Sequence, residues 1–420
     1  VSALDNYIVL CKEPAYAGTT AFASAVNTLG MYLKTFLYPH PLSCDYSFST
    51  LVPVGFGDPG FLFSFLLLIA MFVFSIWKFK QKSEIGFGFL WFFITMSITS
   101  NVFFLIGTSF GERLFFIPSL GLCIALLVGI AHFLRKESEE KNMMLVLQRS
   151  PLFIGLLVLV VVLCSYKTID RNTYWKSDFK LFSEDVQHYP NSTHLLFYMG
   201  NHLSGSEFAE NLELDIAENN LPIDLKDSVQ KANYQSIAML SKSLQIYPAL
   251  PSDGYNQLGK AYFNIGLIDS AQKYYLKAIS EDSTNPIYTN NLGTTFYNQS
   301  IPISQLSEKY RMMGRMDSAQ YYLQISTNKL LEALPYFQRA HKGDTMETDF
   351  INNLGCIYGA TQRIDSALFW FHKAYSIDSL DLISIQFLDI TYRNAGKIQE
   401  ADFFKSRYAI AKSIRNQQLK

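Results

Sequence analysis

Four long apolar stretches constrain this chain more than any other feature of its sequence. A helix needs about 20 mostly apolar residues to cross the hydrocarbon core of a bilayer. The stretches that meet or approach this length run over residues 58–77, 85–106, 113–134 and 150–166. We therefore predict a bundle of transmembrane helices over residues 58–168.

Residues 1–57 are predicted to form a non-cytoplasmic loop region that carries one amphipathic helix, at about residues 21–38. Apolar side chains such as Phe22, Val26 and Leu29 recur there at helical spacing, with polar side chains between them. Such a helix either lies along the membrane interface, which we favour, or crosses the membrane with its polar face packed on other helices.

The distribution of lysine and arginine predicts the orientation of the bundle. Two of the loops between the apolar stretches are basic, and they contain Lys78, Lys80, Lys82, Arg135, Lys136, Lys141 and Arg149. Short basic loops usually stay in the cytoplasm. Residues 39–57, residues 107–113 and everything after Tyr166 are therefore predicted to lie on the non-cytoplasmic side.

The rest of the chain, residues 169–420, has a helical repeat pattern. Leu258-Gly259 is followed 34 residues later by Leu292-Gly293, and Leu354-Gly355 starts the same pattern again. A 34-residue period with small and aromatic packing positions is typical of tetratricopeptide repeats. We predict an all-α protein, in which a polytopic transmembrane helix bundle is followed by a tetratricopeptide-repeat α-solenoid.

Two repeats contain extra sequence. The first insertion covers about residues 205–230 and the second about residues 301–328. The second one has a helix-like pattern of its own at Met316, Ala319 and Tyr322. It therefore either lengthens the two helices of its repeat or adds a repeat.

Repeat solenoids usually bind an extended peptide on their concave surface. Gln257, Asn291 and Asn353 share one position, immediately before the Leu of each Leu-Gly pair. Side-chain amides at this position can pair with a peptide backbone whatever its sequence. These three residues are our candidate peptide-binding residues; the alternative is that they cap a helix or face solvent.

Composition argues against two other classes of function. The formal net charge of -1 leaves no basic surface of the kind that nucleic acid requires. The five cysteines form no Cys-x-x-Cys pair, and no second His lies near His40. We therefore predict neither a nucleic-acid partner nor a metal site.

Three local stretches resemble one family, the transmembrane and tetratricopeptide-repeat O-mannosyltransferases. Residues 39–47 (Pro-His-Pro-Leu-Ser-Cys-Asp-Tyr-Ser) resemble its non-cytoplasmic loop. Residues 112–121 (Glu-Arg-Leu-Phe-Phe-Ile-Pro-Ser-Leu-Gly) resemble its segment at the start of a span, and residues 171–191 resemble its link into the repeats. With the repeats that follow, the resemblance covers nearly the whole chain.

The resemblance implies a polytopic glycosyltransferase that takes mannose from a polyprenyl-phosphate lipid. The sugar would pass to Ser or Thr of proteins on the non-cytoplasmic side, and the repeats would hold the acceptor protein. A carboxylate must accept the hydroxyl proton, and cationic groups must stabilise the departing phosphate. The lipid-linked sugar is a substrate, and no separate cofactor is implied.

Four residues are candidates for binding the lipid phosphate or the donor. Arg113 lies at the outer membrane edge and could bind phosphate bidentately; alternatively, it pairs with Glu112 or reaches towards headgroups. Glu112 is expected to orient Arg113. Asp45 either contacts sugar hydroxyls or caps a turn with its neighbouring serines, and His40 is more often structural than catalytic between two prolines.

The chain also departs from the family. The catalytic acid of the family, and about half of its spans, would lie before Val1, and Phe116 stands where the family usually has Tyr. This chain alone is therefore expected to be inactive. The alternative function is a non-catalytic, membrane-anchored repeat scaffold for protein assembly. Low cysteine use and the Pro-His-Pro loop favour a bacterial inner membrane with periplasmic repeats, which would be lumenal in a eukaryote.

Overall fold

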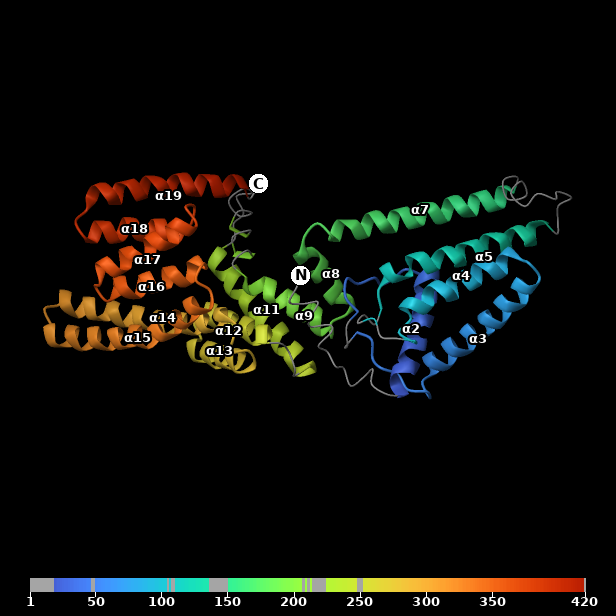
Figure 1. The fold of residues 1–420 in the computed structure, drawn as a ribbon, viewed down its shortest axis with the longest axis horizontal. Helices are drawn as coiled ribbons and strands as arrows, with labels where there is room; N and C mark the ends of the chain where they lie inside the picture. The colour runs from blue at the N-terminus through green and yellow to red at the C-terminus, as the bar shows by residue number, and fades with distance from the viewer. Residues whose placement is uncertain are drawn as a thin grey trace. The chain divides into compact units, whose positions relative to one another are not determined.

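The computed structural model describes residues 19–46, 50–103, 106, 110–135, 150–205, 208–209, 212–213, 224–247 and 252–418. Within these residues the fold is all-helical (Figure 1). The chain divides into two compact units, one made of Val1–Met199 with Gln245–Pro248 and the other of Gly200–Leu244 with Ala249–Lys420. Each unit is described by itself.

The first unit contains the apolar helices. Its elements are α2 (Thr19–Leu37), α3 (Pro59–Lys80), α4 (Glu84–Thr99), the 3-10 helix η2 (Glu112–Phe115), α5 (Phe116–Arg135), α7 (Pro151–Tyr174), α8 (Asp178–His188) and the first part of α9 (Thr193–Ser204). Among the described residues, three helical segments are long and apolar enough to cross a membrane, namely Pro59–Lys80, Glu112–Leu134 and Phe153–Tyr174. The last of these is exposed along its whole apolar length, as expected of a helix that is surrounded by lipid or by other apolar helices.

Helix α4 is shorter than the predicted span 85–106, because it ends at Thr99. Asn101 has a positive φ of 56°, a left-handed conformation that no continuing α-helix contains. Its side-chain oxygen accepts a hydrogen bond from the Ile106 N–H (2.9 Å), and the Ser100 hydroxyl donates to the Ser97 carbonyl (3.2 Å). Polar side chains that bind nearby backbone compete with the helix and end it here.

Helices α4 and α5 approach closely at two glycines. A Cβ added to Gly121 would lie 2.4 Å from the Gly88 carbonyl oxygen, and one added to Gly88 would lie 2.6 Å from the Gly121 carbonyl oxygen. Phe92 and Met96 of α4 are almost fully buried in the same core. The small residues therefore allow two backbones to touch in a bundle where apolar side chains alone provide little selectivity.

Helix α2 packs in parallel with α3. A Cβ at Gly60 would meet the Asn27 side chain, and a Cβ at Gly30 would meet the Ser64 side chain, so residue numbers rise together along both helices. The Tyr32 side chain of α2 is only 1% exposed and packs in the core of the bundle. The helix thus buries one face on the other helices of the bundle.

The second unit is a stack of helical hairpins. Its helices are α11 (Leu225–Ile246), α12 (Ser252–Asn264), α13 (Ile268–Glu281), α14 (Pro286–Met312), α15 (Met316–Gly343), α16 (Thr348–Ala360), α17 (Ile364–Ile377), α18 (Leu382–Asn394) and α19 (Ile398–Gln418). A Cβ at Gly259 would lie 2.6 Å from the Tyr275 ring, and one at Gly355 would lie 2.5 Å from the Phe371 ring. The Leu-Gly pairs are therefore glycine because an aromatic ring of the second helix occupies that space.

The insertion at about 301–328 adds no repeat. It lengthens both helices of one hairpin, so that α14 has 27 residues and α15 has 28. Most of the insertion at about 205–230 lies outside the described residues, as do Lys136, Lys141 and Arg149 of the second basic loop.

We expect Gly121→Ala to destabilise the bundle and Gly129→Ala to leave it unchanged or more stable. The added methyl at Gly121 meets backbone atoms of α4, whereas nothing lies within 4 Å of a Cβ at Gly129. Overpacking of this kind typically costs about 1–3 kcal/mol, whereas alanine raises helix propensity by up to about 1 kcal/mol. Thermal unfolding of the full chain in detergent measures the difference, and equal midpoints for both variants would contradict this account of the α4–α5 contact.

Candidate functional site

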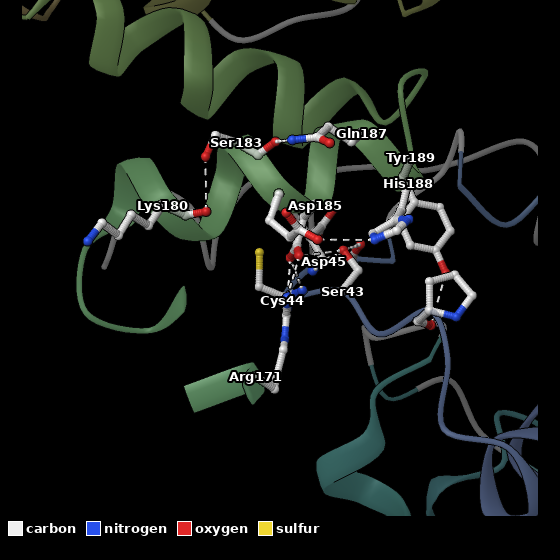
Figure 2. A network of polar contacts seen from close by, with 12 residues as sticks. Ser43, Cys44, Asp45, Arg171, Lys180, Ser183, Asp185, Gln187, His188 and Tyr189 are labelled. Carbon is white, nitrogen blue, oxygen red and sulfur yellow. Dashed lines mark hydrogen bonds and ion pairs between the residues drawn. The ribbon is translucent and has the colours of Figure 1, made fainter. Parts of the chain in front are cut away.

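The candidate site is centred on Asp185, a carboxylate with 0% exposure on the inner face of α8. Asp185 lies one helical turn after the buried Leu181, so the amphipathic pattern of α8 places a charge among its apolar positions. Arg171, near the end of α7, binds it through two bonds, from Nη1 to Oδ1 (2.6 Å) and from Nη2 to Oδ2 (3.0 Å). Figure 2 shows Arg171 and the loop residues converging on this carboxylate.

The same carboxylate holds the loop that connects α2 and α3. The backbone N–H of Cys44 donates to Asp185 Oδ2 (2.7 Å), and the Ser43 hydroxyl lies 3.4 Å from the same oxygen. Burial, and then the neighbouring Asp185 carboxylate, raise the pKa of the Cys44 thiol well above its usual range. Cys44 is therefore a protonated, poorly reactive thiol at neutral pH.

A second carboxylate, in η2, binds the same loop. The Tyr46 hydroxyl donates to Glu112 at the start of η2 and accepts a hydrogen bond from the Ser43 N–H (2.8 Å). Tyr46 is buried, and burial followed by the negative charge of Glu112 raises the pKa of its phenol. Tyr46 thus stays a neutral donor to Glu112.

Asp45 completes the arrangement. Its carboxylate lies 3.3 Å from His194 Nδ1 and accepts from the Ser192 hydroxyl (3.4 Å), both at the start of α9. The Ser43 hydroxyl donates to the Asp45 backbone carbonyl (2.9 Å), so this local contact involves the main chain of Asp45 and not its carboxylate. We call residues 43–46 with their partners Glu112, Arg171, Asp185 and His194 the loop clamp.

The four predicted donor residues divide into two groups. Glu112 and Asp45 lie inside the loop clamp, and Glu112 pairs with Tyr46 rather than with Arg113. Arg113 is exposed and has no ion-pair partner among the described residues. His40 is also exposed, and its ring makes edge contacts with Tyr38 and His188. No group of three His, Cys, Asp or Glu residues in the described part of the chain could hold a metal ion.

The predicted peptide-binding amides lie on α12, α14 and α16, and two of them join neighbouring repeats. Asn291 donates to Asn256 Oδ1 (2.9 Å), and Asn353 donates to Asn290 Oδ1 (2.8 Å). The Gln257 Oε1 atom is buried and finds no hydrogen-bond donor among the described residues. The amide row therefore ties the repeats together and keeps one unsatisfied acceptor.

Sequence reasoning missed Asp185 and His194. Arg171 was recognised only as part of a local motif, because its pairing with a residue 14 positions away on another helix leaves no signal in the sequence. One signal did point to Asp185 itself: its charge falls on the buried face of α8, four residues after Leu181. A charge there requires a partner.

We expect Asp185→Asn to destabilise the first unit by about 3–5 kcal/mol, because Arg171 would keep its buried charge without a counter-charge. The control is Asp178→Asn in the exposed first turn of the same helix. Loss of the favourable interaction between this charge and the helix dipole should lower the free energy of unfolding by only about 0.3–1 kcal/mol. Thermal unfolding measures the loss.

Alkylation of Cys44, followed by peptide mass spectrometry, gives a second measurement. The thiol should react slowly at pH 8 in the parent chain and at least several times faster in Asp185→Asn, since both the charge that raises its pKa and the grip on its loop are lost. Unchanged stability together with unchanged labelling would argue against the loop clamp.

Comparisons with known proteins find similarity both in the repeats and over most of the chain. The tetratricopeptide repeat family model matches residues 252–285 and 348–379. Mouse protein O-mannosyl-transferase TMTC3 is 23% identical over 84% of this chain, and human TMTC3 is 21% identical over 94% of it. A crystal structure of MamA covers 47% of the chain at 20% identity with a TM-score of 0.33.

These relatives are longer than this chain, which spans 37% of mouse TMTC3 and 42% of human TMTC3. Human TMTC1 is 26% identical over 143 residues, which is 34% of this chain and 15% of that protein. The alignment to TMTC3 includes both the apolar helices and the repeats, given its 94% coverage. Over most of its length, the chain is therefore a distant homologue of the TMTC protein O-mannosyl-transferases that carries tetratricopeptide repeats.

Proposed function

We propose that this chain is the C-terminal part of a membrane-embedded glycosyltransferase, which transfers mannose from a polyprenyl-phosphate lipid to Ser or Thr of proteins. The observation that carries the proposal is the loop clamp. The three stretches that resemble the family, around residues 43–46, 112 and 171–185, are far apart in sequence and meet in one cluster. Shared motifs that meet in space favour a shared functional site over an unrelated repeat scaffold.

In this proposal, Arg113 binds the phosphate of the lipid donor. It follows directly after Glu112, which the Tyr46 bond fixes in place, and its own guanidinium is exposed. A guanidinium can bind two phosphate oxygens at once and stabilise the negative charge that develops as the sugar leaves. His40, on the loop that the clamp holds, is the second donor-binding candidate.

We assign Glu112 and Asp45 a positioning role in the donor site. Their carboxylates are engaged by Tyr46 and by His194 with Ser192, so they shape the loop that would border the donor. Asp185 is engaged by Arg171 and Cys44. We assign the carboxylate that accepts the hydroxyl proton to a part of the parent protein that this chain does not contain.

The repeats would hold the acceptor protein along the first helices of the hairpins. The unsatisfied Gln257 acceptor supports this role, because a buried oxygen without a donor is costly and suits an N–H from a bound peptide backbone. Asn291 and Asn353 each donate one amide N–H to the neighbouring repeat, and their side-chain oxygens could accept a hydrogen bond from a ligand. With the basic loops in the cytoplasm, the repeats would lie in the periplasm of a bacterium or in the lumen of a eukaryote.

Transfer of labelled mannose from a polyprenyl-phosphate donor by the full-length parent protein tests the proposal. Product on Ser or Thr of an acceptor protein is the expected result. If no transfer occurs where a TMTC relative is active in parallel, the chain is instead a non-catalytic, membrane-anchored repeat scaffold.

Arg113→Ala in the parent protein should lower kcat/KM for the lipid donor at least tenfold, because one charge-assisted phosphate contact is lost. Arg113→Lys keeps the charge but not the bidentate geometry, so it should recover part of the loss. Lys80→Ala, an exposed cation at the far end of α3, serves as the matched control. Donor kinetics that are the same in all three variants would remove Arg113 from the site.

Gln257→Met should weaken binding of an acceptor peptide about fivefold without lowering the free energy of unfolding. The substitution removes an acceptor that has no partner in the described chain, so folding loses no hydrogen bond there. Gln272→Met is the control, since its amide already donates to Thr295 (2.9 Å). Its stability should fall while peptide affinity, measured by fluorescence anisotropy, stays constant.

A further inference from the structure

Helices α14 and α15 form an arm that is longer than the other hairpins in the described part of the array. They have 27 and 28 residues, whereas α12 and α16 have 13 each, and α13 and α17 have 14 each. At 1.5 Å per residue, the extra length is about 20 Å. The repeat packing positions lie at the start of α14 and the end of α15, so all the extra length lies towards the turn at Gly314 (Figure 1).

The arm is held together by its own contacts. The Ser307 hydroxyl donates to the Ala319 carbonyl (2.6 Å), and the Ser326 hydroxyl donates to the Ser300 carbonyl (3.0 Å). The rings of Tyr310 and Tyr322 stack with centroids 5.3 Å apart. Small buried side chains bring the two helices close along the whole extension, so the tip is presented on a rigid support.

The tip of the arm exposes an unusual group of side chains. Residues 311–317 are all exposed, and three of them are methionines: Met312 at 78%, Met313 at 58% and Met316 at 61%. Tyr321 and Leu323, further down α15, are more than half exposed as well. Exposed apolar side chains that gather in this way mark a candidate interaction surface.

The charges around these methionines are mostly positive. Lys309, Arg311 and Arg315 are exposed, and the acids beside them are Glu308 and Asp317. Glu308 pairs with Arg311 (2.8 Å) on the surface, which leaves Lys309 and Arg315 without an ion-pair partner among the described residues. The local net charge over residues 308–317 is +1, from three cations and two acids.

We propose that the arm docks its tip on an anionic membrane surface. Exposed apolar and tyrosine side chains that are mixed with Lys and Arg match the boundary between headgroups and acyl chains. The methionines would enter that boundary while Lys309 and Arg315 face lipid phosphates. The array is covalently linked to apolar helices that can cross a membrane, so a bilayer is always at high effective concentration. This inference does not depend on the transferase proposal.

Hydrogen–deuterium exchange of the full chain in lipid nanodiscs tests the inference. Discs of phosphatidylcholine alone are compared with discs that contain an equal amount of phosphatidylglycerol. Vesicles of the same composition are added, so that the arm meets a membrane whichever way the repeats face. Amides of residues 312–318 should exchange at least threefold more slowly with the anionic lipid, and the turn at Thr361–Arg363, between α16 and α17, should not change.

Two variants sharpen the test. Replacing Met312, Met313 and Met316 together by Ser should abolish the protection without affecting folding, since all three side chains are exposed. The double variant Lys309→Gln with Arg315→Gln should remove the difference between anionic and neutral lipid. Equal exchange at the tip in both lipids, or protection that appears only when a protein partner is added, would overturn the proposal.

Discussion

The first unit depends on one buried charge. Asp185 has no exposure to solvent, and Arg171 and the Cys44 N–H supply the counter-charge and the hydrogen bonds to its carboxylate. A charge in such a place costs several kcal/mol if any partner is missing. The end of α7, the course of α8 and the conformation of the α2–α3 loop are therefore determined together.

This dependence changes how the acidic residues near the membrane are interpreted. Carboxylates in a proposed transferase site suggest acid–base chemistry, yet Glu112, Asp45 and Asp185 each accept hydrogen bonds from protein groups. What they leave accessible is a cation, Arg113, in η2 just before α5. In the proposed transferase, this part of the protein would therefore supply a cation for an anionic lipid headgroup and would not supply the proton acceptor.

The repeat array follows a different physical rule. Here packing is local, and each glycine of a Leu-Gly pair accommodates an aromatic ring of the next helix. Amide side chains then join successive hairpins, as between Asn291 and Asn256. Because each repeat contacts mainly its neighbours, the array can tolerate one hairpin of twice the usual length. The resulting arm adds surface without disturbing the packing positions near its base.

The sequence by itself determined the class of each part, because apolar length and a 34-residue period are local properties. It also located the glycines, the insertion and the motifs around residues 43, 112 and 171. It could not determine the end of α4, where the side chains of Ser100 and Asn101 compete with the helix, nor whether the insertion lengthened helices or added a repeat. Only the tertiary structure paired Asp185 with Arg171 and Cys44, and Glu112 with Tyr46. Those contacts join residues on different elements, and whether a charge is paired depends on what folding brings beside it.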